Sequence, residues 1–175
     1  MSTNQIFQVE IAGSLLLFTL IAVWYVAPRL APLPLRDALI PLLLLHLTRP
    51  LGLTMLVPAV VDPNLPREFA VPAAYGDLTA AMLALLSIVA LKTGLRAAPA
   101  LVWIFSLVGI GDLANAFFQG GRVGLPQFYV GAVWFIYTVL VPALIVTHIM
   151  IVARLVRHAR AGGGILLWKS SASRS

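Results

Sequence analysis

Five stretches of apolar residues dominate the pattern along the chain, and short polar or proline-containing connections separate them. The hydrocarbon core of a bilayer is about 30 Å thick, which a helix of roughly 20 residues crosses. Inside a bilayer, helices satisfy their own backbone hydrogen bonds, so a helix is the expected form of each stretch. The pattern predicts an all-α bundle of five transmembrane helices, at residues 11–27, 38–57, 73–91, 100–118 and 128–152.

The composition supports this fold class. Hydrophobic residues make up 61% of the chain and charged residues only 10%, whereas charged residues are about 25% of a soluble domain. The 175 residues leave no room for a separate soluble domain beside five spans. We therefore expect one membrane domain at residues 1–160, followed by a basic cytoplasmic tail at residues 161–175. The absence of cysteine excludes disulfides and thiolate metal sites.

The basic residues beside the spans predict the orientation. If the N-terminus is outside, the inner connections and the tail contain Arg29, Arg36, Lys92, Arg96, Arg154, Arg157, Arg160, Lys169 and Arg174. The outer connections then contain only Arg67 and Arg122. Cytoplasmic loops carry an excess of lysine and arginine. The sequence thus predicts a multi-pass protein of the bacterial inner membrane, with its N-terminus outside and its C-terminus in the cytoplasm.

This orientation also bears on possible partners. Because membrane topology accounts for most of the positive charge, nucleic acid is not expected as a partner. Membrane lipids are expected partners, and the basic cluster Arg154, Arg157 and Arg160 should face anionic lipid headgroups. Five helices are few for a self-contained transporter, so we also expect a homo-oligomer or a partner membrane subunit.

Three charged residues lie inside the predicted spans. The motif Gly-Asp-Leu occurs at Asp77 and again at Asp112, and Arg49 lies in a third span. Each charge costs about 2.5–3.5 kcal/mol at the centre of a membrane helix. A rise of 1.5 Å per residue places the three residues roughly 6, 9 and 12 Å below the outer edge of the membrane. We expect them to meet in the outer half, with Asn115 on the same polar stripe as Asp112.

This expected pocket suggests several functions. Two carboxylates opposite one guanidinium lack one positive charge, which favours binding or conduction of a proton or a small cationic solute. One alternative is an accessory or assembly subunit whose charges only fix helix packing. Another is an enzyme that modifies lipids or terpenoids, with the carboxylates as acid and base. No catalytic motif is present, so no catalytic residue is assigned and a non-enzymatic role is preferred.

Two histidines lie inside predicted spans. His46 and His148 could relay a proton from the pocket, together with Thr79 and Tyr137. As a less favoured alternative, the two imidazoles could ligate haem iron; no other cofactor or metal site is expected. The spans place His46 roughly 12 Å and His148 roughly 6 Å from the inner edge.

One phrase of the sequence suggests a family. The segment Phe69-Ala70-Val71-Pro72-Ala73-Ala74-Tyr75-Gly76-Asp77 is followed by a second Gly-Asp pair in the next span. This arrangement resembles an uncharacterised family of small bacterial multi-helix membrane proteins with paired Gly-Asp motifs. The resemblance implies a multi-helix membrane fold and assigns no activity and no site residue.

Overall fold

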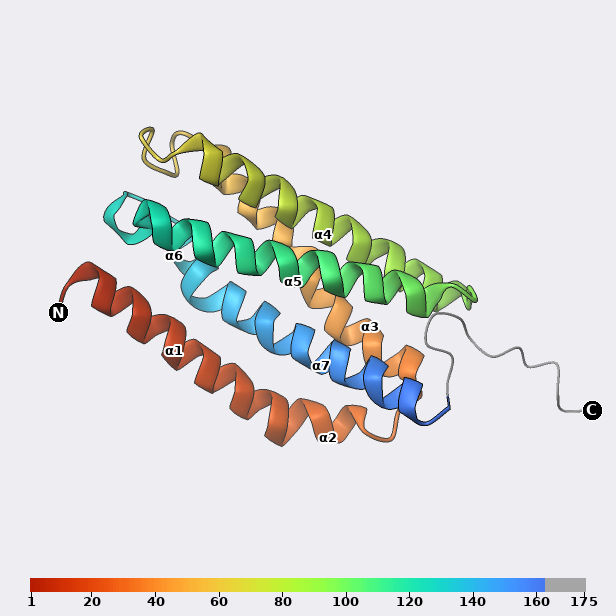
Figure 1. Cartoon of the computed structure of the whole chain (residues 1–175). Helices are drawn as coiled ribbons and strands as arrows, with labels where there is room; N and C mark the ends of the chain where they lie inside the picture. Colours follow the sequence, from red (N-terminus) through yellow and green to blue (C-terminus); the bar gives the residue numbers. More distant parts are fainter. Residues whose placement is uncertain (163–175) are drawn as a thin grey trace, which may run out of the picture.

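A computed structural model describes residues 1–162 of the chain, and this part is helical with no strand (Figure 1). The elements are α1 (Thr3–Ile21), the π-helix η1 (Ala22–Val26), α2 (Ala27–Leu30), α3 (Leu35–Leu45), the 3-10 helix η2 (His46–Leu56), α4 (Arg67–Thr93), α5 (Ala98–Val123), the 3-10 turn η3 (Leu125–Gln127), α6 (Val133–Phe135), the π-helix η4 (Ile136–Leu140) and α7 (Val141–Arg160).

These elements join into five continuous segments that are long and apolar enough to cross a membrane, as the apolar pattern predicts. The segments are Thr3–Leu30, Leu35–Leu56, Arg67–Thr93, Ala98–Val123 and Val133–Arg160.

The helices extend beyond the apolar runs at most ends. In α1 the Ser2 hydroxyl accepts a hydrogen bond from the Gln5 backbone, and the Gln5 side chain accepts one from the Ser2 backbone. This capping box starts the helix eight residues before the predicted span. The loop expected at residues 28–37 shortens to 31–34, because Pro28 fits the first turn of α2. Most of the predicted tail, with Lys169 and Arg174, lies outside the described residues.

The helix α4 makes extensive contacts with two other elements. It packs against η2 and α5, while α7 packs against α1, α3 and α5 (Figure 1). Ala80 and Ala84 of α4 are fully buried. Small side chains at this spacing let neighbouring helices approach closely.

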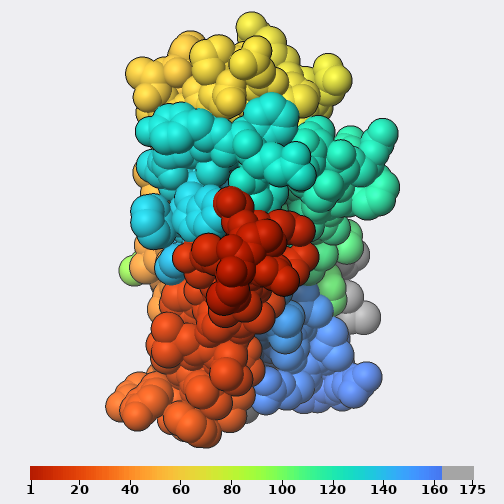
Figure 2. All heavy atoms as spheres, turned by 90° about the vertical axis from the view of Figure 1, so that its left-hand side faces the viewer, coloured from red at the N-terminus to blue at the C-terminus, as the bar shows by residue number. Residues whose placement is uncertain are grey.

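Two irregular connections meet at the end of the bundle that carries the N-terminus. Figure 2 views this end, where residues 57–66 (yellow) lie above the connection that follows α5 (teal and cyan). The Asp62 amide donates a hydrogen bond of 2.6 Å to the Tyr129 carbonyl. Gly131 has a φ of 46° and packs against the carbonyl oxygen of Val60. The fifth span starts at Val133, later than the predicted residue 128, because this left-handed turn comes first.

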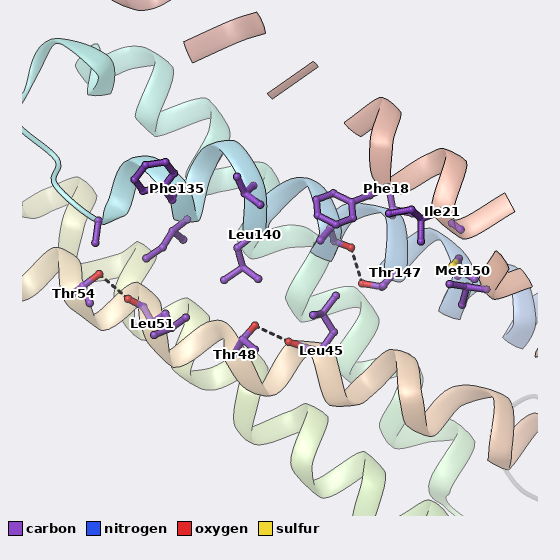
Figure 3. Close-up of a pocket in the computed structure, with 17 residues that line it drawn as sticks. Phe18, Ile21, Leu45, Thr48, Leu51, Thr54, Phe135, Leu140, Thr147 and Met150 are labelled. Atoms are coloured by element: carbon purple, nitrogen blue, oxygen red, sulfur yellow. Dashed lines mark hydrogen bonds between the residues drawn. The ribbon is translucent and has the colours of Figure 1, made fainter. Parts of the chain in front are cut away.

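An apolar groove lies between part of the first helical segment and its neighbours. It has a volume of about 760 Å³ and lies between α1 and η1 on one side and η2, η4 and α7 on the other (Figure 3). The only hydroxyls in its lining belong to Thr48, Thr54 and Thr147, and each lies within hydrogen-bonding distance of a backbone carbonyl of its own helical segment. The groove therefore presents hydrocarbon to whatever occupies it.

The contact at Gly131 generates a prediction for stability. In Gly131→Ala the new Cβ would overlap the Val60 carbonyl oxygen, and the left-handed backbone alone costs about 1–2 kcal/mol with a side chain. We expect a melting temperature several degrees lower for the purified protein. The matched control is Gly13→Ala in α1, where no atom lies within 4 Å of the new Cβ. An unchanged melting temperature for Gly131→Ala would contradict this account of the connection.

Candidate functional site

The helix η2 places one residue in three on its buried face. Its buried residues are His46, Arg49, Gly52 and Met55. A 3-10 helix has three residues per turn, so side chains three apart lie directly above one another. In an α-helix each step of three residues would rotate by about 60°, and the first and last of these four residues would face opposite sides. The 3-10 geometry is therefore what brings His46 and Arg49 to one line.

Pro50 gives a local reason for the change from α3 to η2. A proline inside an α-helix has no amide hydrogen to donate to the carbonyl four residues earlier, and its ring collides with that carbonyl. In this chain the carbonyl belongs to His46, the residue at which the α-helix ends. The irregular geometry of this segment therefore includes Arg49.

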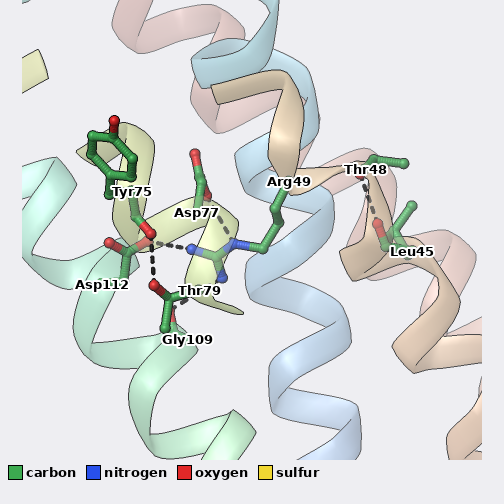
Figure 4. Close-up of polar contacts among 8 residues, drawn as sticks. All are labelled: Leu45, Thr48, Arg49, Tyr75, Asp77, Thr79, Gly109 and Asp112. Carbon is green, nitrogen blue, oxygen red and sulfur yellow. Dashed lines mark hydrogen bonds and ion pairs between the residues drawn. The ribbon is translucent and has the colours of Figure 1, made fainter. Parts of the chain in front are cut away.

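Arg49 lies between two carboxylates from two other helices (Figure 4). Its Nε donates to Asp77 of α4 at 2.8 Å, and its Nη2 donates to Asp112 of α5. Its Nη1 donates to the backbone carbonyl of Gly109 at 3.4 Å. The Arg49 side chain is fully buried, and those of Asp77 and Asp112 are 15% and 11% exposed. With both acids ionised, this cluster of three residues has a formal charge of −1.

Three glycines provide the space for these side chains. A Cβ on Gly52 would overlap the carboxylate of Asp77, and a Cβ on Gly76 would overlap that of Asp112. At Gly109 it would lie 2.7 Å from the His148 ring and 3.2 Å from Arg49 Nη1. Each of the helices η2, α4 and α5 thus contributes one charged residue and one glycine that makes room for a neighbour.

The polar neighbours expected in this cluster do not all join it. Asn115 is exposed, and none of the hydrogen bonds of the cluster involves it. Thr79 is also exposed, and its hydroxyl donates to the Tyr75 carbonyl of its own helix. Tyr137 is buried, and its ring lies 6.3–6.4 Å from three phenylalanine rings, those of Phe7, Phe69 and Phe117.

His46 and His148 lie closer together than the predicted depths suggest. Their ring centroids are 4.2 Å apart, and both residues are buried. The helix α7 continues to Arg160, past the apolar run that set the predicted edge. Counted from the helix ends, His148 is twelve residues in and His46 eleven, or roughly 18 and 17 Å at the α-helical rise. The two histidines therefore share one level.

The contact between the imidazoles does not suit haem. Two axial histidines bind iron from opposite faces of the porphyrin, which requires a gap between the rings wide enough for the macrocycle. Here the rings touch each other, and Phe105 lies 4.9 Å from both. Among residues 1–162, no three His, Asp or Glu side chains are grouped to hold a metal ion. A haem therefore does not fit between these two rings.

The basic cluster predicted for the inner surface lies in the last turns of α7. Arg157 and Arg160 are exposed and Arg154 is partly buried. The Arg157 guanidinium donates to the Ala153 carbonyl at 3.2 Å. These arginines thus lie at the end of a helical segment that is long and apolar enough to cross a membrane.

The sequence was compared with known protein families. A family model described as a domain of unknown function, DUF8737, matches residues 6–156. This chain belongs to the DUF8737 family. The match includes three of the five helical segments in full, most of the first and the fifth, and every member of the charged cluster. No curated protein and no solved structure matches the chain. Membership of the DUF8737 family therefore assigns no activity to this chain.

Two neighbours of the histidines were not anticipated from the sequence of this DUF8737 protein. Phe105 stacks on His148, and the Thr147 hydroxyl lies 3.1 Å from His46 Nε2. Neither residue stands out in an apolar run. The three-residue period of His46, Arg49, Gly52 and Met55 is the one signal that could have indicated the shared face in advance.

The two Gly-Asp motifs offer a matched pair of variants. Gly76→Ala places a Cβ in the Asp112 carboxylate, whereas the new Cβ of Gly111→Ala meets no atom within 4 Å. We expect Gly76→Ala to lose several degrees of melting temperature because Asp112 must leave Arg49. Gly111→Ala should melt at or slightly above the wild-type temperature, since alanine favours the helix. Equal effects of the two variants on the melting temperature would contradict the described packing.

Proposed function

We propose that this protein spans a membrane and that its cluster of Arg49, Asp77 and Asp112 binds a proton or a small monovalent cation. The observation that carries the proposal is the count of charges around a fully buried guanidinium. One positive charge faces two carboxylates from separate helices. In apolar surroundings an uncompensated charge is costly, so the cluster favours taking up one more positive charge.

The position of the cluster supports uptake from one side. With the basic residues in the cytoplasm, the N-terminus is outside and the cluster lies in the outer half of the membrane, as the positive-inside rule favours. The outer location fits a site that takes up a cation from the external medium or from the periplasm. We assign the protein to the inner membrane of a bacterium on the same argument.

A second copy or a partner membrane subunit is part of this proposal. Asn115 on α5 and Tyr75 on α4 are exposed although both lie in segments that can span a membrane. Polar side chains at helix interfaces in membranes hydrogen-bond across helices. Contact with another membrane helix would give these two side chains partners that lipid cannot offer.

A packing role is the second candidate, and the close fit of both carboxylates over glycines favours it. The two roles differ in what the loss of one charge does. Asp77→Asn and Asp112→Asn each leave one carboxylate opposite Arg49, so we expect melting temperatures close to the wild type. Arg49→Gln leaves two buried carboxylates without a cation and should lower the free energy of unfolding by about 3–5 kcal/mol. If the asparagine variants lose as much stability as Arg49→Gln, the charges serve packing.

Uptake of the positive charge is measured directly on the full-length protein in detergent. The infrared band of a protonated carboxyl group reports a bound proton at neutral pH. A rise of the melting temperature with sodium or methylammonium chloride, at constant ionic strength, reports a bound cation. We expect one of these signals in the wild type and its loss in Asp112→Asn. Binding at 100 times Kd stabilises by about 2.7 kcal/mol. A wild type with neither signal would contradict the proposed function.

The proposed orientation is tested with single cysteines, because the chain has none of its own. Ser2→Cys should react with a membrane-impermeant maleimide in intact cells. Thr93→Cys, in the exposed turn that ends α4, should react only after the membrane is permeabilised. The opposite pattern of labelling would reverse the proposed orientation.

A further inference from the structure

His46 and His148 form a buried imidazole pair whose hydrogen-bonding capacity is largely unused. They come from η2 and α7, and Phe105 of α5 lies edge-on to the first ring and stacked on the second. Their exposures are 0% and 1%. His46 Nδ1 and both ring nitrogens of His148 have no hydrogen-bond partner among the described residues. Buried polar atoms in proteins nearly always have a partner, so three such nitrogens together point to a bound species.

The fourth ring nitrogen, His46 Nε2, has a neighbour that limits where the hydrogen of this ring can be. His46 Nε2 lies 3.1 Å from the Thr147 hydroxyl, which is also 2.9 Å from the Ala143 carbonyl. The hydroxyl has one hydrogen and can donate it to only one of them. If it donates to the carbonyl, His46 Nε2 carries a hydrogen and His46 Nδ1 is a free acceptor. Either arrangement leaves a proton-accepting nitrogen inside the bundle.

Gly109 places the pair beside the charged cluster. A Cβ at this glycine would touch both His148 Nε2, at 2.7 Å, and Arg49 Nη1, at 3.2 Å. The imidazole and the guanidinium therefore share the space above one glycine. Arg49 holds the carboxylates with Nε and Nη2, and its Nη1 donates to the Gly109 carbonyl beside the His148 ring.

The count of charges links the two groups. Asp77, Asp112 and Arg49 together carry a charge of −1 when both acids are ionised. A proton on either imidazole adds the missing positive charge, and so does a proton on either carboxyl group. The same proton thus has two locations of equal total charge, one on each side of Arg49.

We propose that His46 and His148 are a second proton site, coupled across Arg49 to the site formed by Asp77 and Asp112. This proposal rests on the proposed function and narrows its cation to a proton. In the exchange one carboxyl O–H bond breaks and one imidazole N–H bond forms, with no change of oxidation state. A water bound to the unpartnered ring nitrogens would supply the hydrogen-bonded path between the two sites.

The surroundings of the pair limit where this proton can go. The titratable or charged groups that face the pair are Arg49 and, beyond it, Asp77 and Asp112; Phe105 and Thr147 have none. Toward the other end of the bundle the buried core is mainly apolar, with Leu39, Leu43 and Leu91 among its residues, and its buried polar side chains are the hydroxyls of Ser87 and Ser106, which do not titrate. The pair is therefore the innermost proton acceptor that the cluster reaches in this conformation.

Nitrogen NMR of histidine-labelled full-length protein in lipid bilayers tests the proposal. The chain has only three histidines, so His46→Gln, His148→Gln and the matched control His158→Gln on α7 assign every signal. As the pH is lowered, we expect an imidazolium signal from the pair while the protein remains folded. Asp112→Asn removes the excess negative charge of the cluster and should lower the imidazolium population at a given pH about tenfold. Asp77→Asn serves the same purpose if Asp112→Asn does not fold.

Two results would overturn the second site. One is a pair that stays neutral over the whole pH range in which the protein is folded. The other is an imidazolium population that neither aspartate variant changes. If the carboxyl infrared band or the cation-dependent melting temperature still depends on Asp112, the proposed function survives and only the histidine site is lost.

Discussion

The contact of one buried guanidinium with two carboxylates is the constraint on which the rest of the bundle depends. A buried charge left without any partner costs about 3–5 kcal/mol, so η2, α4 and α5 must keep a register in which the carboxylates and Arg49 stay together. The glycines that the two acids and the arginine pack against make that register possible. The same glycines thus allow the three helices to approach closely and leave room for the charged side chains between them.

The 3-10 geometry of the second span extends this arrangement to the histidines. Because side chains three apart lie in line, His46 and Arg49 face the same interior. His148 comes from α7, and its ring and Arg49 Nη1 both pack beside Gly109. Two carboxylates and two imidazoles are thus gathered around one guanidinium.

The sequence predicts the number of spans and the meeting of the three charges, but not the rotation of each helix. Apolar runs give the span count, and a fixed rise per residue gives common depths. The prediction that Asn115 joins the pocket is wrong. Asn115 is two residues, or about 200°, from the buried Leu113, so it lies on the opposite face of α5. The predicted depth of His148 is too small. The helix α7 continues beyond Val152 through basic residues, which hydropathy alone places outside the span.

The most direct test of the central claim is solid-state NMR of the labelled full-length protein in lipid bilayers, measuring distances from the Arg49 guanidinium to both aspartate carboxyl carbons. The account predicts that both carboxyl carbons show contact distances to the same guanidinium, in the same sample. A guanidinium that contacts only lipid phosphate, or only one of Asp77 and Asp112, would contradict it.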